Sequence, residues 1–159
     1  MMIIRENGTA EFQMHEDGDI SNETYKGDFT VKCALTPYET ILADRKYREL
    51  LGDNMVMASQ DAQNFAFALS QLEQRIVKYP PFWKNDIING CHIKDDNILT
   101  YVLEQAFKAQ KAYMDKKAIE ADEIEKSLTE AFEKGLIKRD DDGVDEQDLD
   151  DTPVVDTNE

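Results

Sequence analysis

The residues with the widest capacity for chemistry lie close together at Cys91, His92, Asp95 and Asp96. A thiolate, an imidazole and carboxylates all bind zinc, but zinc sites draw their ligands from spaced pairs, and the chain has no Cys-x-x-Cys. The same Cys and His fail as nucleophile and base because adjacent side chains usually point apart. We therefore expect no metal centre here, and we expect Cys33 and Cys91 to be free thiols.

Motifs of other chemistries are absent. The seven glycines form no phosphate-binding loop, and neither Gly-x-Ser-x-Gly nor His-Glu-x-x-His occurs. The acidic runs around Gly18 and Gly143 suggest calcium loops, but they would place Gln13 or Lys138 at the first ligand position of an EF-hand. Carboxylates are so numerous that no pair stands out as general acid and base. The sequence predicts a non-catalytic protein without cofactor or metal.

The net charge of −16 is unevenly distributed along the 159 residues. Ten carboxylates and no Lys or Arg lie between Asp140 and Glu159, so the first 139 residues carry only −6. This balance argues against binding to nucleic acid or to anionic membrane, since both require basic surfaces. No run approaches the roughly 20 apolar residues of a membrane span, and we expect a soluble, cytoplasmic protein.

The N-terminal residues 1–35 are predicted to be β-rich. The Asn7-Gly8 pair lies between apolar residues and favours a hairpin turn, because both types tolerate positive φ. The clearest strand runs from Phe29 to Leu35, with Phe29, Val31, Cys33 and Leu35 alternating on one face.

Helices are predicted over residues 36–113, the helical core. Thr36-Pro37-Tyr38-Glu39 is a capping box with proline in the first turn, and Gly52 ends that first helix. Ser59 or Asp61 caps the second helix. The residues of its apolar face are Phe65, Leu69, Leu72, Ile76 and Tyr79. Pro80-Pro81 then ends it.

The last helical pattern begins at Asp95 or Asp96 and ends at Gly135, as one helix or as two. Residues 114–137 have a narrow apolar stripe among Lys, Glu and Ala, which predicts a helical arm. The arm either packs on its own body, swings, pairs with a second subunit or receives a partner. Residues 138–159 are predicted to be a disordered acidic tail, because they are too poor in apolar groups to fold.

The fold class that follows is α+β and mainly α. A small N-terminal β-hairpin or antiparallel sheet packs on a three-helix body, with a long C-terminal helix and a disordered acidic tail. Residues 1–137 are expected to form a single domain.

Apolar helix faces are the most promising binding surfaces in this chain. Phe82 and Trp83 follow two prolines, and they either plug the core or anchor a partner. The candidate partner-binding residues are Phe82, Trp83, Phe107, Tyr113, Ile124, Leu128 and Phe132.

Four segments carry a resemblance to a known family. They are Tyr25 to Pro37, Ala43 to Gly52, Phe67 to Leu72, and Pro80 to Trp83. Over roughly residues 25–113 the chain resembles the tail assembly chaperones of tailed bacteriophages. The resemblance rests on the succession of a strand, a helix begun by proline, and further helices. It brings no catalytic residues with it.

The resemblance implies a small, acidic, largely helical protein of the host cytoplasm. Such chaperones coat the helical tape measure protein until tail-tube subunits replace them, and many occur in a short and a frameshifted long form. The expected partners are therefore a tape measure protein or a tail-tube subunit, or a second copy of the chain. Two alternatives stay open: a structural or tail-completion protein of the virion, and an acidic DNA mimic that inhibits a host nucleic-acid enzyme.

Overall fold

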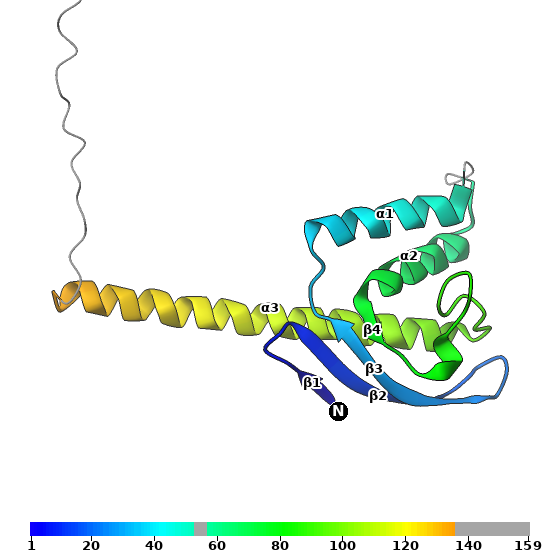
Figure 1. Ribbon diagram of the computed structural model, residues 1–159, viewed down its shortest axis with the longest axis horizontal. Helices are drawn as coiled ribbons and strands as arrows, with labels where there is room; N and C mark the ends of the chain where they lie inside the picture. The colour runs from blue at the N-terminus through cyan, green and yellow to red at the C-terminus, as the bar shows by residue number, and fades with distance from the viewer. Residues whose placement is uncertain (53–56, 136–159) are drawn as a thin grey trace, which may run out of the picture. The chain divides into compact units, whose positions relative to one another are not determined.

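The computed structural model describes residues 1–52 and 57–135 (Figure 1). The elements in chain order are β1 (Met2–Ile4), β2 (Thr9–Asp17), β3 (Thr24–Lys32), α1 (Pro37–Leu51), α2 (Gln60–Arg75), β4 (Ile76–Lys78), the 3-10 helix η2 (Pro81–Trp83) and α3 (Asp96–Glu133). An N-terminal antiparallel sheet and three helices confirm the predicted α+β class. The predicted acidic tail, residues 138–159, lies outside the described residues.

The chain divides into two compact units, Met1–Glu120 and Ala121–Glu159. The boundary falls inside the segment 114–137 that the sequence marked as a helical arm. α3 is one continuous helix of 38 residues, which answers the question of one helix or two. In the part of the chain that the structure describes, no helix combines the length and the apolar character of a membrane span.

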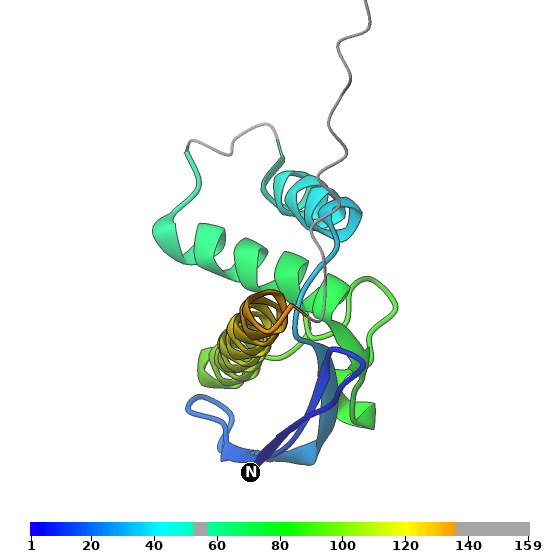
Figure 2. The ribbon, with the colours of Figure 1, turned by 90° about the vertical axis from the view of Figure 1, so that its left-hand side faces the viewer.

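The four strands form one antiparallel sheet in the order β1-β2-β3-β4. The predicted hairpin at Asn7-Gly8 joins β1 to β2, and Gly8 adopts a φ of 77° there. Register places Phe12 opposite Phe29, whose rings stack 5.4 Å apart. Alternate residues of β2 and β3 point into the core, which α2, η2 and the first half of α3 complete (Figure 2).

Two predicted boundaries are wrong. β3 spans Thr24–Lys32 instead of 29–35, although Phe29, Val31 and Cys33 are buried as predicted. α2 ends at Arg75, so Ile76 and Tyr79 are not helical. The chain leaves the helix at Ile76 because Ile76 pairs with Val31 and forms β4 on the free side of β3. Helical spacing alone cannot reveal such a long-range pairing.

Both ends of α1 and the start of α2 follow the predicted signals. The Thr36 side chain accepts from the amide of Glu39, and the Glu39 carboxylate accepts from the amide of Thr36, which completes the capping box. Gly52 ends α1 with a φ of 63°. Ser59, one of the two candidate caps, accepts from the Ala62 amide at the start of α2.

Trp83 belongs to the core. Its exposed fraction is 1%, and its ring meets that of Phe29 edge to face at 5.3 Å. Gly90 lies against the indole with a φ of 85°, where a side chain would strike the ring. Phe82 is half-buried between Tyr25 and Phe29. Of the two interpretations of this aromatic pair, the core plug is the one that holds for Trp83.

A buried carboxylate fastens the β2–β3 loop to the start of α3. Asp95 is fully buried and accepts from the amides of Ile20 and Ser21, the Ser21 hydroxyl and the Tyr25 hydroxyl, at 2.6–2.8 Å. A Cβ at Gly18 would overlap the same carboxyl group. Four donors therefore occupy Asp95 fully, and its role is structural.

Candidate partner-binding surface

The residues with catalytic potential are not brought together. Cys91 Sγ contacts Asn85 Oδ1 at 3.4 Å, whereas His92 Nε2 lies 2.8 Å from the carbonyl oxygen of Phe82. Both cysteines are free, and burial raises the pKa of the Cys33 thiol. Within residues 1–52 and 57–135, no group of three His, Cys, Asp or Glu is placed to hold a metal ion.

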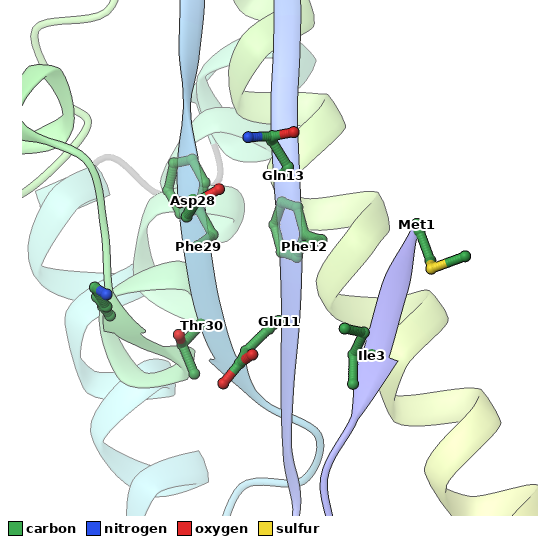
Figure 3. Close-up of a pocket in the computed structure, with 9 residues that line it drawn as sticks. Met1, Ile3, Glu11, Phe12, Gln13, Asp28, Phe29 and Thr30 are labelled. Atoms are coloured by element: carbon green, nitrogen blue, oxygen red, sulfur yellow. The ribbon is translucent and has the colours of Figure 1, made fainter.

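A hollow of about 410 Å³ lies on the outer face of the sheet (Figure 3). Figure 3 shows Gln13 and Asp28, paired across β2 and β3, pointing outward beside Glu11 and Thr30. The Glu11 carboxylate is held by Arg5 at 2.8 Å, and this hydrogen bond lowers its pKa. The lining offers no nucleophile beside a base, so we regard the hollow as a polar sheet surface.

Three aromatic rings from three helices form a row on the first unit. Tyr47 of α1 meets Phe67 of α2 edge to face, and Phe67 stacks on Phe107 of α3, with 6.5 Å between centroids in both pairs. Phe67 is 43% exposed and Phe107 is 37% exposed. We call Tyr47, Phe67 and Phe107 the ring row. Two large apolar side chains held at the surface by three packed elements are a typical protein-binding feature.

Beneath the ring row lies a buried cation. Arg75 at the end of α2 is 5% exposed, and its guanidinium carbon is 5.1 Å from the centroid of the Phe107 ring. Nη2 donates to Gln110 Oε1 at 2.7 Å, and Nε donates to Gln71 Oε1 at 3.5 Å. Nη1 is buried without a hydrogen-bond partner.

The electrostatic position of Arg75 is unusual. Among the described residues no carboxylate forms an ion pair with it. Burial lowers its pKa, and the nearby Cys33 acts in the opposite direction. A buried cation without an ion pair is costly. The guanidinium instead contacts two side-chain amide oxygens and the face of the Phe107 ring. These contacts hold the Phe107 ring in place.

An apolar groove of about 270 Å³ adjoins Phe67 between α2 and α3. Its lining is Asn64, Phe65, Phe67, Ala68, Leu99, Thr100 and Leu103. The small side chain of Ala68 leaves room at the floor, where Leu99 is also buried. The groove and the ring row together offer pockets for apolar side chains on successive turns of a helix.

The predicted binding residues divide into four groups. Phe107 lies in the ring row, while Trp83 is in the core and Phe82 is packed against it. Tyr113 is half-buried, and its hydroxyl lies close to Gly8. Ile124, Leu128 and Phe132 lie in the second unit, with exposed fractions of 61%, 46% and 37%.

The sequence did not predict a role in the binding surface for Tyr47, Phe67 or Arg75. Phe67 and Arg75 share one face of α2 because they are eight residues apart, a spacing that places them about 80° apart on the helix. The helical spacing of these two residues could therefore have indicated that they lie on the same side of α2. Nothing in the sequence indicated that Tyr47 and Phe107 would meet them from other helices.

No protein-family model matches this chain, and neither do any curated protein or solved structure.

Proposed function

We propose that this protein is a non-catalytic chaperone of bacteriophage tail assembly that holds an amphipathic helix of its client, a tape measure protein. The observation that carries the proposal is the exposed pair Phe67 and Phe107, stacked at 6.5 Å beside an apolar groove. Large aromatic side chains in a fixed arrangement dominate the energetics of protein interfaces. The resemblance to tail assembly chaperones supplies the identity of the client.

The close packing around Phe107 supports a binding role. Phe107 is held from below by Arg75 and from the side by Phe67, so little conformational entropy is lost when a partner covers it. The groove beside Phe67 accepts a neighbouring apolar side chain from the same client helix. A helix with apolar residues at positions i, i+3 and i+4 fits this succession of sites.

The charge distribution supports reversible binding. A net charge of −16 keeps a complex with an apolar client soluble. An interface formed by two rings and one groove is small compared with the roughly 1,600 Å² of a standard stable interface, which suits a chaperone that must later yield to tail-tube subunits.

Co-expression with the tape measure protein of the same phage tests the proposal. We expect a soluble complex that Phe67→Ala/Phe107→Ala disrupts, with client retention falling about tenfold or more. The matched control is Tyr38→Ala/Ile41→Ala, which removes side chains that are 68% and 62% exposed on the side of α1 away from Tyr47. Equal loss in both variants would contradict the site.

Mass spectrometry of purified virions provides the second arm. A chaperone leaves the particle, so we expect the chain to be absent from mature virions. Its presence at a stoichiometry comparable to that of tail proteins would instead identify a structural component of the virion.

A further inference from the structure

The second unit presents its own apolar stripe. On the last turns of α3, Ile124 is 61% exposed and Leu128 is 46% exposed, four residues apart on one side of the helix. Ala121 continues the stripe toward the N-terminal end, since it precedes Leu128 by one heptad. We call Ala121, Ile124 and Leu128 the α3 stripe. Two large aliphatic side chains at this spacing are typical of a helix that pairs with another helix.

The charges around the α3 stripe are strongly one-sided. From Ala121 to Glu133 the helix carries five carboxylates, namely Asp122, Glu123, Glu125, Glu130 and Glu133, against the single ammonium of Lys126. Lys134, the next residue, is paired with Glu130 at 3.5 Å. These carboxylates belong to the same helical segment as the stripe. The stripe therefore lies in a negative field.

We infer that the α3 stripe binds a basic amphipathic helix of the client, one with an apolar seam flanked by Lys or Arg. This inference rests on the proposed function, and it adds a second contact with a defined charge preference. A second copy of the chain fits less well, because pairing would bring two such acidic segments together. The net charge of −16 adds to the repulsion between two copies.

Two synthetic helices serve as probes for the full-length chain. Each has about three heptads with Leu at positions a and d, and the flanking positions carry Lys in one peptide and Glu in the other. In fluorescence anisotropy we expect the Lys peptide to bind at least about tenfold more tightly, and the difference to shrink as NaCl rises from about 0.05 M to about 0.5 M. Equal binding of the two peptides would overturn the inference.

Substitutions in α3 locate the contact. Ile124→Ser/Leu128→Ser should weaken binding of the Lys peptide about tenfold or more. Ile119→Ser is the matched control, because Ile119 is 60% exposed on the same helix but lies about 140° around it from Ile124. All three side chains are exposed, so circular dichroism should show unchanged helix content. Undiminished binding by the double variant would place the contact elsewhere and refute the inference.

Sedimentation of the peptide-free chain tests the competing occupant of the stripe, a second copy of the chain. We expect a monomer. A dimer that dissociates in the Ile124→Ser/Leu128→Ser variant would assign the stripe to a second copy.

Failure of this inference is distinguishable from failure of the proposed function. Client capture that depends on Phe67 and Phe107 but not on Ile124 and Leu128 refutes only the inference. Discovery of the chain in virions refutes only the chaperone role, since the peptide comparison is independent of it.

Discussion

The guanidinium carbon of Arg75 lies 5.1 Å from the centroid of the Phe107 ring, while the ring of Phe67 stacks on that of Phe107 at 6.5 Å. A residue at the end of α2 thereby fixes a side chain of α3 at the surface. The hydrogen bond from Arg75 to Gln110 at 2.7 Å joins the same two helices. A buried cation thus supports the candidate binding surface from inside.

Two replacements of Arg75 should separate the destabilising effect of its buried charge from the stabilising effect of its packing. Arg75→Met retains most apolar contacts and removes an unpaired buried charge, so the free energy of unfolding should stay unchanged or rise. Arg75→Ala leaves a cavity and should lower it by about 2–4 kcal/mol. Urea unfolding measures both variants. If Met proves as damaging as Ala, the hydrogen bond to Gln110 contributes more than the charge costs.

Trp83, the only tryptophan of the chain, reports on the core. Its exposed fraction of 1% predicts a blue-shifted fluorescence emission that moves to the red when the protein unfolds. Trp83→Ala should lower the free energy of unfolding by about 3–5 kcal/mol. Client binding should leave the emission unchanged. A shift on client addition, or ready quenching by acrylamide, would restore Trp83 as a partner anchor.

Acid should weaken the junction between β3 and α1 through Glu39. A hydrogen bond from Lys32, followed by that from the Thr36 amide, lowers the pKa of Glu39 to about 2. A carboxyl with a depressed folded pKa contributes stability above its unfolded pKa, and loses that contribution as pH falls toward the folded value. The difference in Tm between wild type and Glu39→Gln should therefore be constant above about pH 5 and shrink between about pH 4.5 and 2. A difference that persists at pH 2 would contradict this assignment.

The second acid-sensitive contact is Asp95. Burial opposes its ionisation, but hydrogen bonds from Ser21, Tyr25 and the Ile20 amide outweigh that effect and hold its pKa well below the usual range. By the same sign argument, Asp95 stabilises the fold above its unfolded pKa of about 4. Asp95→Asn should lower Tm at pH 7 by at least about 5 °C, because its amide group cannot accept from all four donors. A smaller change would show that the loop has another anchor.

Gly18 is required by its closeness to Asp95. A Cβ at this position would overlap the Asp95 carboxyl group, so Gly18→Ala should cost about 1–3 kcal/mol of unfolding free energy. The cost should be smaller in an Asp95→Ala background, where the obstructing group is gone. A double-mutant cycle by urea unfolding measures this coupling. Additive effects of the two substitutions would contradict the overlap with the Asp95 carboxyl group as the cause.

Local signals in the sequence determined where α1 begins and ends and where α2 begins. Thr36, Gly52 and Ser59 each act at the predicted helix end, because caps depend only on neighbours within one turn. Alternation along Phe29, Val31 and Cys33 likewise identified buried positions correctly. The sequence also predicted where the α3 pattern begins and ends, but it left open whether the pattern forms one helix or two.

Only the tertiary structure decided which side chains meet. Ile76 left its helix because a partner strand, far away in sequence, offered backbone hydrogen bonds. The packing of α2 against α3 places Phe67 and Phe107 together at the surface, with Arg75 beneath them. Neither the sequence pattern nor the composition encodes that contact. Caps and alternation act over a few residues and can be recognised locally. Burial, pairing and the buried unpaired cation depend on the packing of distant segments, so they became visible only in the folded chain.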